Sequence, residues 1–164
     1  MNYTELTNAI KEYTDNTETT FVNNIPNFVR QTEERIYRSI LIPELRKNVT
    51  TSVTSSNRFL AKPIDFLAVF SIAVVDGSSN YSFLLPKDVN FIREAYPATA
   101  TTGLPVYYSL FDGDNFLIAP TPDSAYNVEL HYFYRPASIT AGSDSDKKWL
   151  SINAPSALLY ACLL

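Results

Sequence analysis

The sequence predicts an α+β protein: a helical bundle, made of N-terminal helices and a C-terminal helix, that carries an antiparallel β-hairpin-rich insertion. Apolar residues recur at helical spacing through residues 1–48 and again through 153–164, whereas they alternate with a period of two through most of 49–137. The chain of 164 residues has the size of one domain. We therefore expect a single domain, 1–164, in which 138–150 is a polar loop.

The helical part is predicted from three short patterns. Leu6, Ile10 and Tyr13 share one stripe, and Thr4 is expected to cap this first helix. A second helix is expected to begin at Pro26, because a proline in the first turn lacks only an N–H that the helix does not use. The apolar face of the second helix would consist of Val29, Ile36, Tyr37 and Ile40.

The β-rich part is predicted from alternation and turn residues. Residues 66–75 form an apolar run that ends at the turn signal 76–80, and residues 126–134 alternate apolar and polar side chains. Asp112-Gly113-Asp114 separates two alternating stretches and predicts a hairpin. A short helix is expected over 87–94, with Val89 and Ile92 inward. Asn153 is expected to cap the last helix.

Composition excludes several classes of protein. The net charge of −4 and pI near 4.9 disfavour general binding to nucleic acid or to an anionic membrane. The longest apolar runs fall short of the roughly 20 residues that a membrane helix needs, and the polar N-terminus does not predict a signal peptide. Cys162, the single cysteine, has apolar neighbours and is expected in the core; it fits a reducing compartment.

The sequence offers no catalytic constellation, so we predict that the protein is not an enzyme and binds no cofactor or metal. The lone His131 is expected at an outward, exposed position of a strand, without a second transition-metal ligand. Asp112 and Asp114 are interpreted as turn residues. Asp144-Ser145-Asp146 opens like a calcium loop, but Lys147-Lys148 follows where the loop would need other residues.

One concentration of basic residues is a candidate interaction surface. On the second helix, Arg30–Glu34 and Glu34–Arg38 have the spacing of ion pairs, and Glu33-Glu34 is expected on a solvated or interfacial face. A nucleic-acid site would interleave aromatic side chains among the arginines, so a protein–protein surface is favoured. The candidate residues are Arg30, Glu34, Arg35, Arg38, Arg46 and Lys47.

The order of motifs in the middle of the chain resembles the head-to-tail adaptor, or connector, proteins of tailed bacteriophages. The similarity extends over about residues 26–164, and each motif alone is ordinary turn and strand chemistry. The motifs are Leu60 to Leu67 (LAKPIDFL), Gly103 to Tyr108 (GLPVYY), Asp112-Gly113-Asp114, Phe116 to Asp123 (FLIAPTPD), Tyr126 to Tyr134 (YNVELHYFY), Trp149-Leu150 and the closing helix.

The resemblance implies a structural virion protein of the neck or tail, assembled in the host cytoplasm. It implies a homo-oligomeric ring, a dodecamer, that joins the portal protein to the tail nozzle or tail tube. Genomic DNA would pass through its lumen during ejection without sequence-specific binding, and no membrane would be involved. Family members usually continue through a further C-terminal helix that often engages the portal, so the helix that ends at Leu164 is expected to be cut short.

Two alternatives stay open at this point. A β-rich, tail-associated binding module for glycans or proteins would use the eleven tyrosines for stacking, but it leaves the amphipathic helices at both ends unexplained. A hydrolase that uses acidic residues is less favoured, because no nucleophile and base stand out in the sequence.

Overall fold

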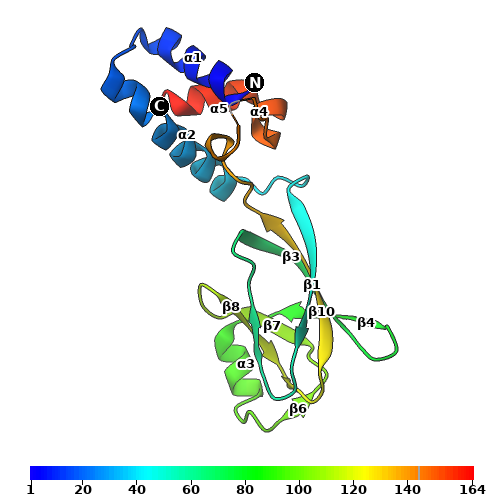
Figure 1. Cartoon of the computed structure of the whole chain (residues 1–164). Helices are drawn as coiled ribbons and strands as arrows, with labels where there is room; N and C mark the ends of the chain where they lie inside the picture. Colours follow the sequence, from blue (N-terminus) through cyan, green and yellow to red (C-terminus); the bar gives the residue numbers. More distant parts are fainter. Residues whose placement is uncertain (144) are drawn as a thin grey trace. The chain divides into compact units, whose positions relative to one another are not determined.

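The computed structural model describes residues 1–143 and 145–164, and it confirms the α+β class (Figure 1). The chain forms two compact units. Unit 1 consists of Met1–Ile42 and Arg135–Leu164, and unit 2 is the intervening Pro43–Tyr134. Both ends of the chain therefore contribute to unit 1, while unit 2 is continuous in sequence.

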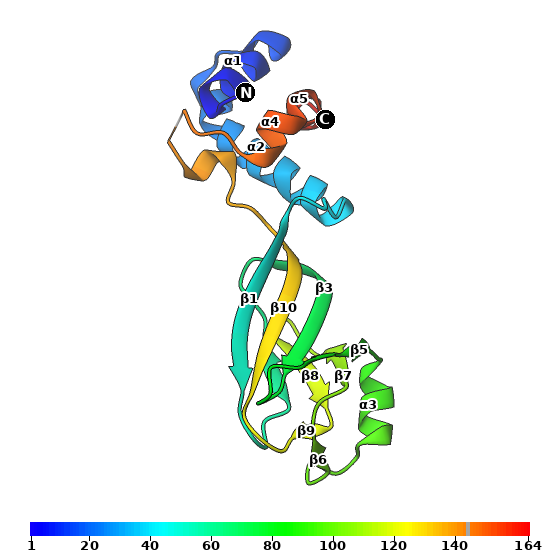
Figure 2. The same ribbon diagram turned by 90° about the vertical axis from the view of Figure 1, so that its right-hand side faces the viewer.

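Unit 1 contains the helices α1 (Tyr3–Thr14), α2 (Thr19–Ser39), α4 (Trp149–Asn153) and α5 (Pro155–Cys162), with the 3-10 helix η1 (Ile139–Ala141). Helix α5 contacts α1, α2 and α4, and η1 contacts α2 (Figures 1 and 2). The side chains buried almost completely in this unit include Leu6, Ile10, Ile25, Val29, Ile139 and Leu158.

The cap of α1 differs from the prediction. Asn2, not Thr4, is the N-cap: its side chain accepts a hydrogen bond from Glu5 N at 2.8 Å, and Glu5 Oε2 accepts one from Asn2 N at 2.9 Å. This reciprocal arrangement satisfies two N–H groups that a helix start otherwise leaves unpaired, which explains why the helix begins one residue before Thr4.

The predicted start of the second helix at Pro26 is wrong, because α2 begins seven residues earlier at Thr19 and contains Pro26 in its interior. Proline cannot donate a hydrogen bond to the preceding turn, which normally weakens a helix. Ile25 and Val29 on either side are fully buried, and this packing holds the helix continuous through the proline.

The buried stripe of α2 is also rotated relative to the prediction. Ile36 is only half-buried, and Ile40 follows the helix and is 60% exposed. The side chains that α2 buries are Ile25, Val29, Thr32, Glu33 and Tyr37. Glu33 thus lies in the stripe that the sequence assigned to apolar residues alone.

The segment expected as a loop, 138–150, is partly helical. Ser138 caps η1 by accepting a hydrogen bond from Thr140 N at 3.1 Å, and α4 begins at Trp149. The expected cap Asn153 is instead the last residue of α4, with Ala154 in a non-helical conformation between the two helices. Pro155 in the first turn of α5 explains the break, because proline starts a helix more easily than it continues one.

Unit 2 is built from two four-stranded sheets. The first, sheet A, has the order β1-β10-β3-β4, with antiparallel neighbours throughout. The second, sheet B, has the order β2-β8-β7-β5, in which β5 and β7 are parallel and the other pairs antiparallel. The strands are β1 (Arg46–Val53), β2 (Phe59–Ala61), β3 (Phe66–Val75), β4 (Tyr81–Phe83), β5 (Leu85–Pro86), β7 (Tyr107–Leu110), β8 (Asn115–Ala119) and β10 (Tyr126–Tyr134), with a small parallel pair of β6 (Thr102–Gly103) and β9 (Thr121–Pro122).

The hairpin at Asp112–Asp114, the turn at 76–80 and the short helix that the sequence predicts are confirmed. Leu110 pairs with Phe116 across the Asp112–Asp114 turn, and Val75 pairs with Tyr81 across the 76–80 turn. The helix over 87–94 is α3 (Val89–Ala95), which Asp88 caps by accepting from Asn90 N at 2.8 Å. Its Ile92 is fully buried, as expected.

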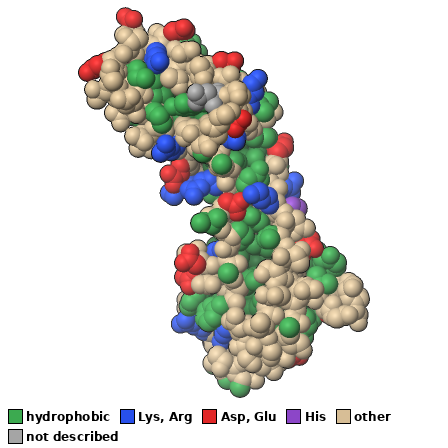
Figure 3. Space-filling view, in the orientation of Figure 1, with side chains coloured by type: hydrophobic (Ala, Val, Ile, Leu, Met, Phe, Trp, Pro, Cys, Tyr) green, Lys and Arg blue, Asp and Glu red, His purple; other side chains and the backbone are tan. Residues whose placement is uncertain are grey.

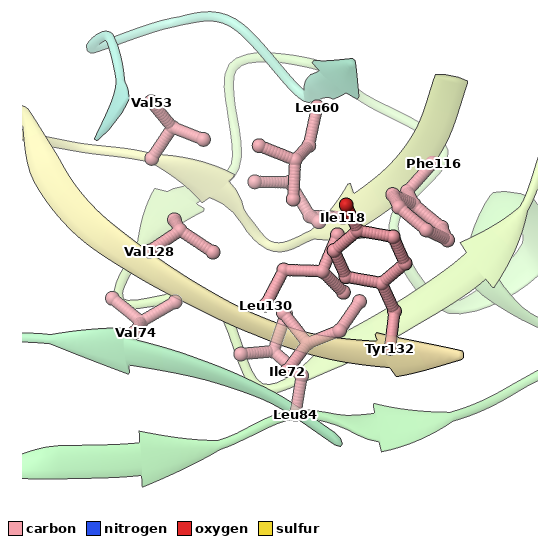
Figure 4. Packing of buried hydrophobic residues seen from close by; sticks show 10 residues of the cluster. All are labelled: Val53, Leu60, Ile72, Val74, Leu84, Phe116, Ile118, Val128, Leu130 and Tyr132. Atoms are coloured by element: carbon pink, nitrogen blue, oxygen red, sulfur yellow. The ribbon is translucent and has the colours of Figure 1, made fainter. Parts of the chain in front are cut away.

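The core of unit 2 lies between the two sheets (Figure 4). Sheet A contributes Ile72, Val74, Val128 and Leu130, among others, and Phe116 of sheet B faces them. A second cluster, which includes Leu117 and Ala119 of β8 and Ile92 of α3, lies on the opposite face of sheet B. Strand β8 is therefore buried on both faces, and unit 2 has three layers: sheet A, sheet B and α3.

The two ends of unit 2 lie side by side. β1 and β10 pair antiparallel from Arg46–Phe133 to Val53–Tyr126, and Tyr134 N donates to Leu45 O at 3.1 Å just before the first of these pairs. The first strand thus begins at Arg46 rather than at residue 49, and the chain enters and leaves unit 2 through neighbouring strands.

Candidate contact surfaces

The charged face of α2 carries one of the two ion pairs that its spacing predicts. Arg38 Nη2 lies 2.6 Å from Glu34 Oε1, and Arg135 Nη1 lies 3.7 Å from the same oxygen. Arg30 makes no ion pair with Glu34 among the described residues; its Nε donates to Thr140 Oγ1 at 3.0 Å. Arg30 therefore ties α2 to η1, and Glu34 is shared between two arginines.

A hollow of about 500 Å³ lies beside this face, between α1, α2 and the end of α5. Arg35 lies at this hollow, whose other lining residues are mainly apolar. They are Ile10, Thr14, Phe21, Phe28, Gln31, Thr32, Ala161, Cys162, Leu163 and Leu164. The geometry shows a recess with an arginine beside apolar side chains.

Cys162, predicted in the core, is only half-buried because it lines this hollow. Thr32 Oγ1 donates to Ala161 O at 3.1 Å and attaches the end of α5 to α2. Burial raises the pKa of the Cys162 thiol, and the nearby Glu33 carboxylate raises it further, although a hydrogen bond to Thr32 acts in the opposite direction. The thiol is thus held in its neutral, less reactive form.

Glu33 does not lie on a solvated face, contrary to the prediction. Its side chain is only 3% exposed, and Oε1 accepts a hydrogen bond from Ile139 N at 3.1 Å. The other oxygen, Oε2, is buried without a hydrogen-bond partner. Burial raises the pKa of the Glu33 carboxyl, and this outweighs the opposing effects of Ser138, the Ile139 N–H and the charge of Lys148.

Arg46 and Lys47 belong to unit 2, whereas Arg30, Glu34, Arg35 and Arg38 belong to unit 1. Arg46 Nε donates to Pro43 O at 2.7 Å, and its guanidinium lies over the Phe70 ring, 4.6 Å from the centroid. Lys47 Nζ lies 2.6 Å from Asp65 Oδ2 and 4.1 Å from the centroid of Tyr134. Both cations are thus engaged within the β-rich unit.

Asp65 is the centre of a small polar network on sheet A. It accepts from Lys47 and, through Oδ1, from the Tyr132 hydroxyl at 2.8 Å. Partial burial raises the pKa of Asp65, but the hydrogen bonds from Lys47 and Tyr132 and the lysine charge outweigh it, so the pKa is lowered overall. Burial and the hydrogen bond to Asp65 raise the pKa of Tyr132 to about 12.

The acidic turn at Asp112 has the geometry of turn chemistry, as predicted. Asp112 Oδ1 accepts from Asp114 N at 2.7 Å and from Asn115 N at 2.6 Å, and these bonds lower the pKa of Asp112. Asp144, the first residue of the other acidic motif, lies outside the described residues. In 1–143 and 145–164, no group of three or more His, Cys, Asp or Glu side chains is placed to hold a metal ion.

His131 faces away from the core of unit 2, as predicted, but it is half-buried rather than exposed. The ring of Phe70 lies against it edge-on, with 5.0 Å between the centroids. Sequence reasoning missed this contact because the two residues come from different strands, β3 and β10. It also missed the burial of Glu33, although the four-residue spacing Val29–Glu33–Tyr37 was a usable signal.

The side chains singled out by the sequence therefore hold helices and strands together or lie at the surface. Figure 3 shows apolar side chains at the surface of both units, with acidic and basic side chains among them. The sequence matches the SU10 adaptor protein family over residues 1–164. The chain belongs to this family of phage head–tail adaptors, which are structural proteins that interact with other head and tail proteins in the virion.

No curated protein matches the sequence significantly. In the part of the chain that the structure describes, no helix has the length and apolar character required to cross a bilayer.

Proposed function

We propose that this protein assembles into a closed ring of identical copies, twelve in number, between the portal protein and the tail nozzle or tail tube. The family match over the entire chain is the observation that carries the proposal. A closed cyclic assembly needs two different, complementary surfaces on each copy, because each copy contacts one neighbour on either side. The ring would form part of the DNA channel, without catalytic activity.

The net charge of −4 supports a channel that does not retain DNA. Phosphate groups bind tightly only where basic side chains neutralise them, and binding then weakens steeply with salt. An acidic ring would let the genome slide during ejection. Retention of double-stranded DNA by the purified ring at physiological salt would contradict this part of the proposal.

We also propose a role for the charged face of α2, defined by Arg30, Glu34, Arg35 and Arg38, as a contact with a neighbouring copy or with the portal. Arg35 and Arg38 are exposed, and Arg38 already pairs with a carboxylate in a mixed-charge arrangement. Arginine favours such contacts because its planar fork binds carboxylates with two hydrogen bonds. Arg46 and Lys47 would contribute a separate contact on unit 2.

The architecture that would serve this role is a helical bundle with a β-rich insertion, in one domain. The discontinuous unit 1, interrupted by the continuous unit 2, supports the insertion. In the adaptor, one part would contact the portal and the other would contact the tail or the neighbouring copies.

Mass measurement and negative-stain electron microscopy of the complex isolated from virions test the function. We expect a ring with an axial hole and a mass of about twelve chains. A complex that contains only one or two copies contradicts the ring. Screening the pure protein for hydrolase activity with and without Mg²⁺ tests the non-catalytic part, since turnover that follows the protein through purification would contradict it.

A further inference from the structure

Sheet A has two open edges. β1 is its first strand, and within 1–143 and 145–164 no other strand pairs with its outer side. At the opposite edge, β4 pairs only with Ala73–Val75 of β3, so the stretch of β3 from Phe66 to Ser71 has no described strand on that side. In Figure 2, β1 and β3 lie on either side of β10.

The outward backbone groups of β1 follow from the ladder. Tyr134 N donates to Leu45 O, so these two residues form a hydrogen-bonded pair. In an antiparallel ladder such pairs alternate with pairs whose N–H and C=O groups point away from each other. Asn48, Thr50 and Ser52 therefore direct their backbone groups outward, and Asn48 to Ser52 are all exposed.

Beyond its first two residues, Arg46 and Lys47, β1 lacks the features that usually keep an edge strand from pairing. From Asn48 to Val53 it contains no charged residue, no proline and no glycine, and its register with β10 is unbroken. Edge strands that remain in water are commonly protected by lysine, proline or a bulge. Val49, Thr50 and Thr51 are β-branched and favour extended backbone.

A groove of about 620 Å³ lies along the open part of β3. Phe66 to Val69 form one wall, and residues 86–89 with 108–110 form the other. The register between β3 and β10 shifts twice in this stretch, between His131 and Tyr132 and again between Phe133 and Tyr134. Between the two shifts Ala68 pairs with Phe133, and Val69 pairs with Tyr132, whose own backbone groups face β1; Val69 therefore directs its backbone groups into the open edge. Most of the residues that line the groove are apolar, and Leu110 among them is more than half exposed.

We propose that β1 of one copy pairs with the open edge of β3 in the next copy, so that sheet A continues from subunit to subunit around the ring. This inference rests on the proposed ring. β1 and β3 both run antiparallel to β10 and hence parallel to each other, so the pairing between rotated copies is parallel. In this pairing the eight residues of β1 lie beside about six residues of β3 in the next copy. Each copy uses one edge of sheet A for one neighbour and the other edge for the second neighbour, as a cyclic assembly requires.

Two proline variants, each with one blocked edge, test the pairing. Thr50→Pro removes an outward N–H from β1, and Val69→Pro removes one from β3; neither removes a hydrogen bond to β10. We expect each variant alone to lose the ring in analytical ultracentrifugation. Mixed together, they retain one intact pairing, between β1 of the Val69→Pro copy and β3 of the Thr50→Pro copy. The mixture should therefore form a pair of copies but no ring.

Thr50→Ala and Val69→Ala are the matched controls, because they shorten the same side chains and keep the N–H groups; both should form rings. If wild-type and proline variants form rings equally well, the β1–β3 pairing is overturned while the ring stands. If the wild-type chain forms no ring, the proposed function itself fails.

Hydrogen exchange on the wild-type protein gives a second readout if a proline variant fails to fold. Amides in 46–53 and 66–71 should exchange more slowly in the ring than in the dissociated subunit. Equal exchange in the two states, or protection that appears only after the portal protein is added, would overturn the pairing between copies.

Discussion

Glu33 shows how one carboxyl group can oppose the fold that contains it. The side chain occupies a buried position of α2, and only one of its oxygens has a hydrogen-bond partner. A buried carboxylate without full hydrogen bonding is unfavourable, so the folded state prefers the protonated form. Folding thus raises the pKa of Glu33 above its ordinary value near 4.5.

We predict that Glu33→Gln stabilises the protein at neutral pH. Glutamine keeps an oxygen for the Ile139 N–H and removes the buried charge. Folding raises the pKa of Glu33, so the wild-type protein loses stability as the pH rises from the pKa that Glu33 has in the unfolded chain to the pKa that it has in the folded protein. Above both pKa values the loss is complete. The gain at about pH 8 should be on the order of 1 kcal/mol, or roughly 2–4 °C in Tm.

Glu34→Gln is the control for this variant, because the neighbouring carboxylate is partly exposed and pairs with Arg38 and Arg135. Its stability should change by less than about 0.5 kcal/mol. Thermal unfolding at about pH 4, where Glu33 is largely protonated in both states, should bring Glu33→Gln and wild type together. An equal gain at both pH values would show that the charge of Glu33 is not the cause.

Asp65 has the opposite dependence on pH. Its pKa is lowered on folding by Lys47 and Tyr132, so its contribution to stability is present above the unfolded pKa and is lost as the pH falls through the folded pKa. We predict that Asp65→Asn costs on the order of 1 kcal/mol at neutral pH and progressively less in acid. Urea unfolding at several pH values measures the difference, and a penalty that grows in acid would contradict the sign.

At the scale of the element, α2 combines a buried face with an exposed mixed-charge face. The buried residues pack α2 against the rest of unit 1. Arg35 and Arg38 are exposed and do not contribute to this packing. Substitutions at exposed positions usually change stability by about 0.5 kcal/mol or less. A strong effect on assembly would therefore identify a contact with another chain.

We predict that Arg35→Glu combined with Arg38→Glu leaves the circular dichroism spectrum unchanged but weakens ring formation or docking onto the portal. Reversal replaces attraction with repulsion at the proposed contact and also removes the Glu34–Arg38 pair. The defect should grow at low salt, where charge repulsion is least screened. Electron microscopy of reconstituted rings at two salt concentrations measures it.

Arg35→Gln with Arg38→Gln is the matched control, because it removes the charges without adding repulsion, and a smaller defect with weaker salt dependence is expected. Normal assembly of the reversed variant at low salt would show that this face of α2 is only solvated.

The elements that the sequence predicted well are those specified by local chemistry. Alternation and turn residues are sufficient for the hairpin at Asp112, because neighbouring residues determine both its strands and its turn. The start of α2 was missed because proline is locally unfavourable inside a helix, and only the burial of Ile25 and Val29 explains its tolerance there.

The candidate surface was predicted less completely than the fold. The Glu34–Arg38 pair follows from spacing within one helix, but Arg30 contacts Thr140, which lies 110 residues away in sequence. The open edges of sheet A depend on strand order, which no local pattern in β1 or β3 reveals. Contacts between distant segments were thus the part that the sequence could not supply.

At the scale of the whole molecule, the proposed single domain makes a prediction about unfolding. If units 1 and 2 stabilise each other, calorimetry should show one cooperative transition, with the van't Hoff and calorimetric enthalpies equal. Glu33→Gln in unit 1 and Asp65→Asn in unit 2 should then shift the same transition in opposite directions at neutral pH. Two transitions, each shifted by only one of the variants, would show that the units unfold separately.

The hydrogen bond between Tyr134 and Leu45 has a consequence for the history of the chain. Because the entry and exit strands of unit 2 are adjacent, a short linker could replace everything between them. The entropic cost of bringing the two ends of an inserted segment together rises only slowly with the length of that segment. Recombination between phage genomes could therefore exchange residues 43–134 as a cassette, giving one set of helices a new β-rich partner without rebuilding the helices themselves.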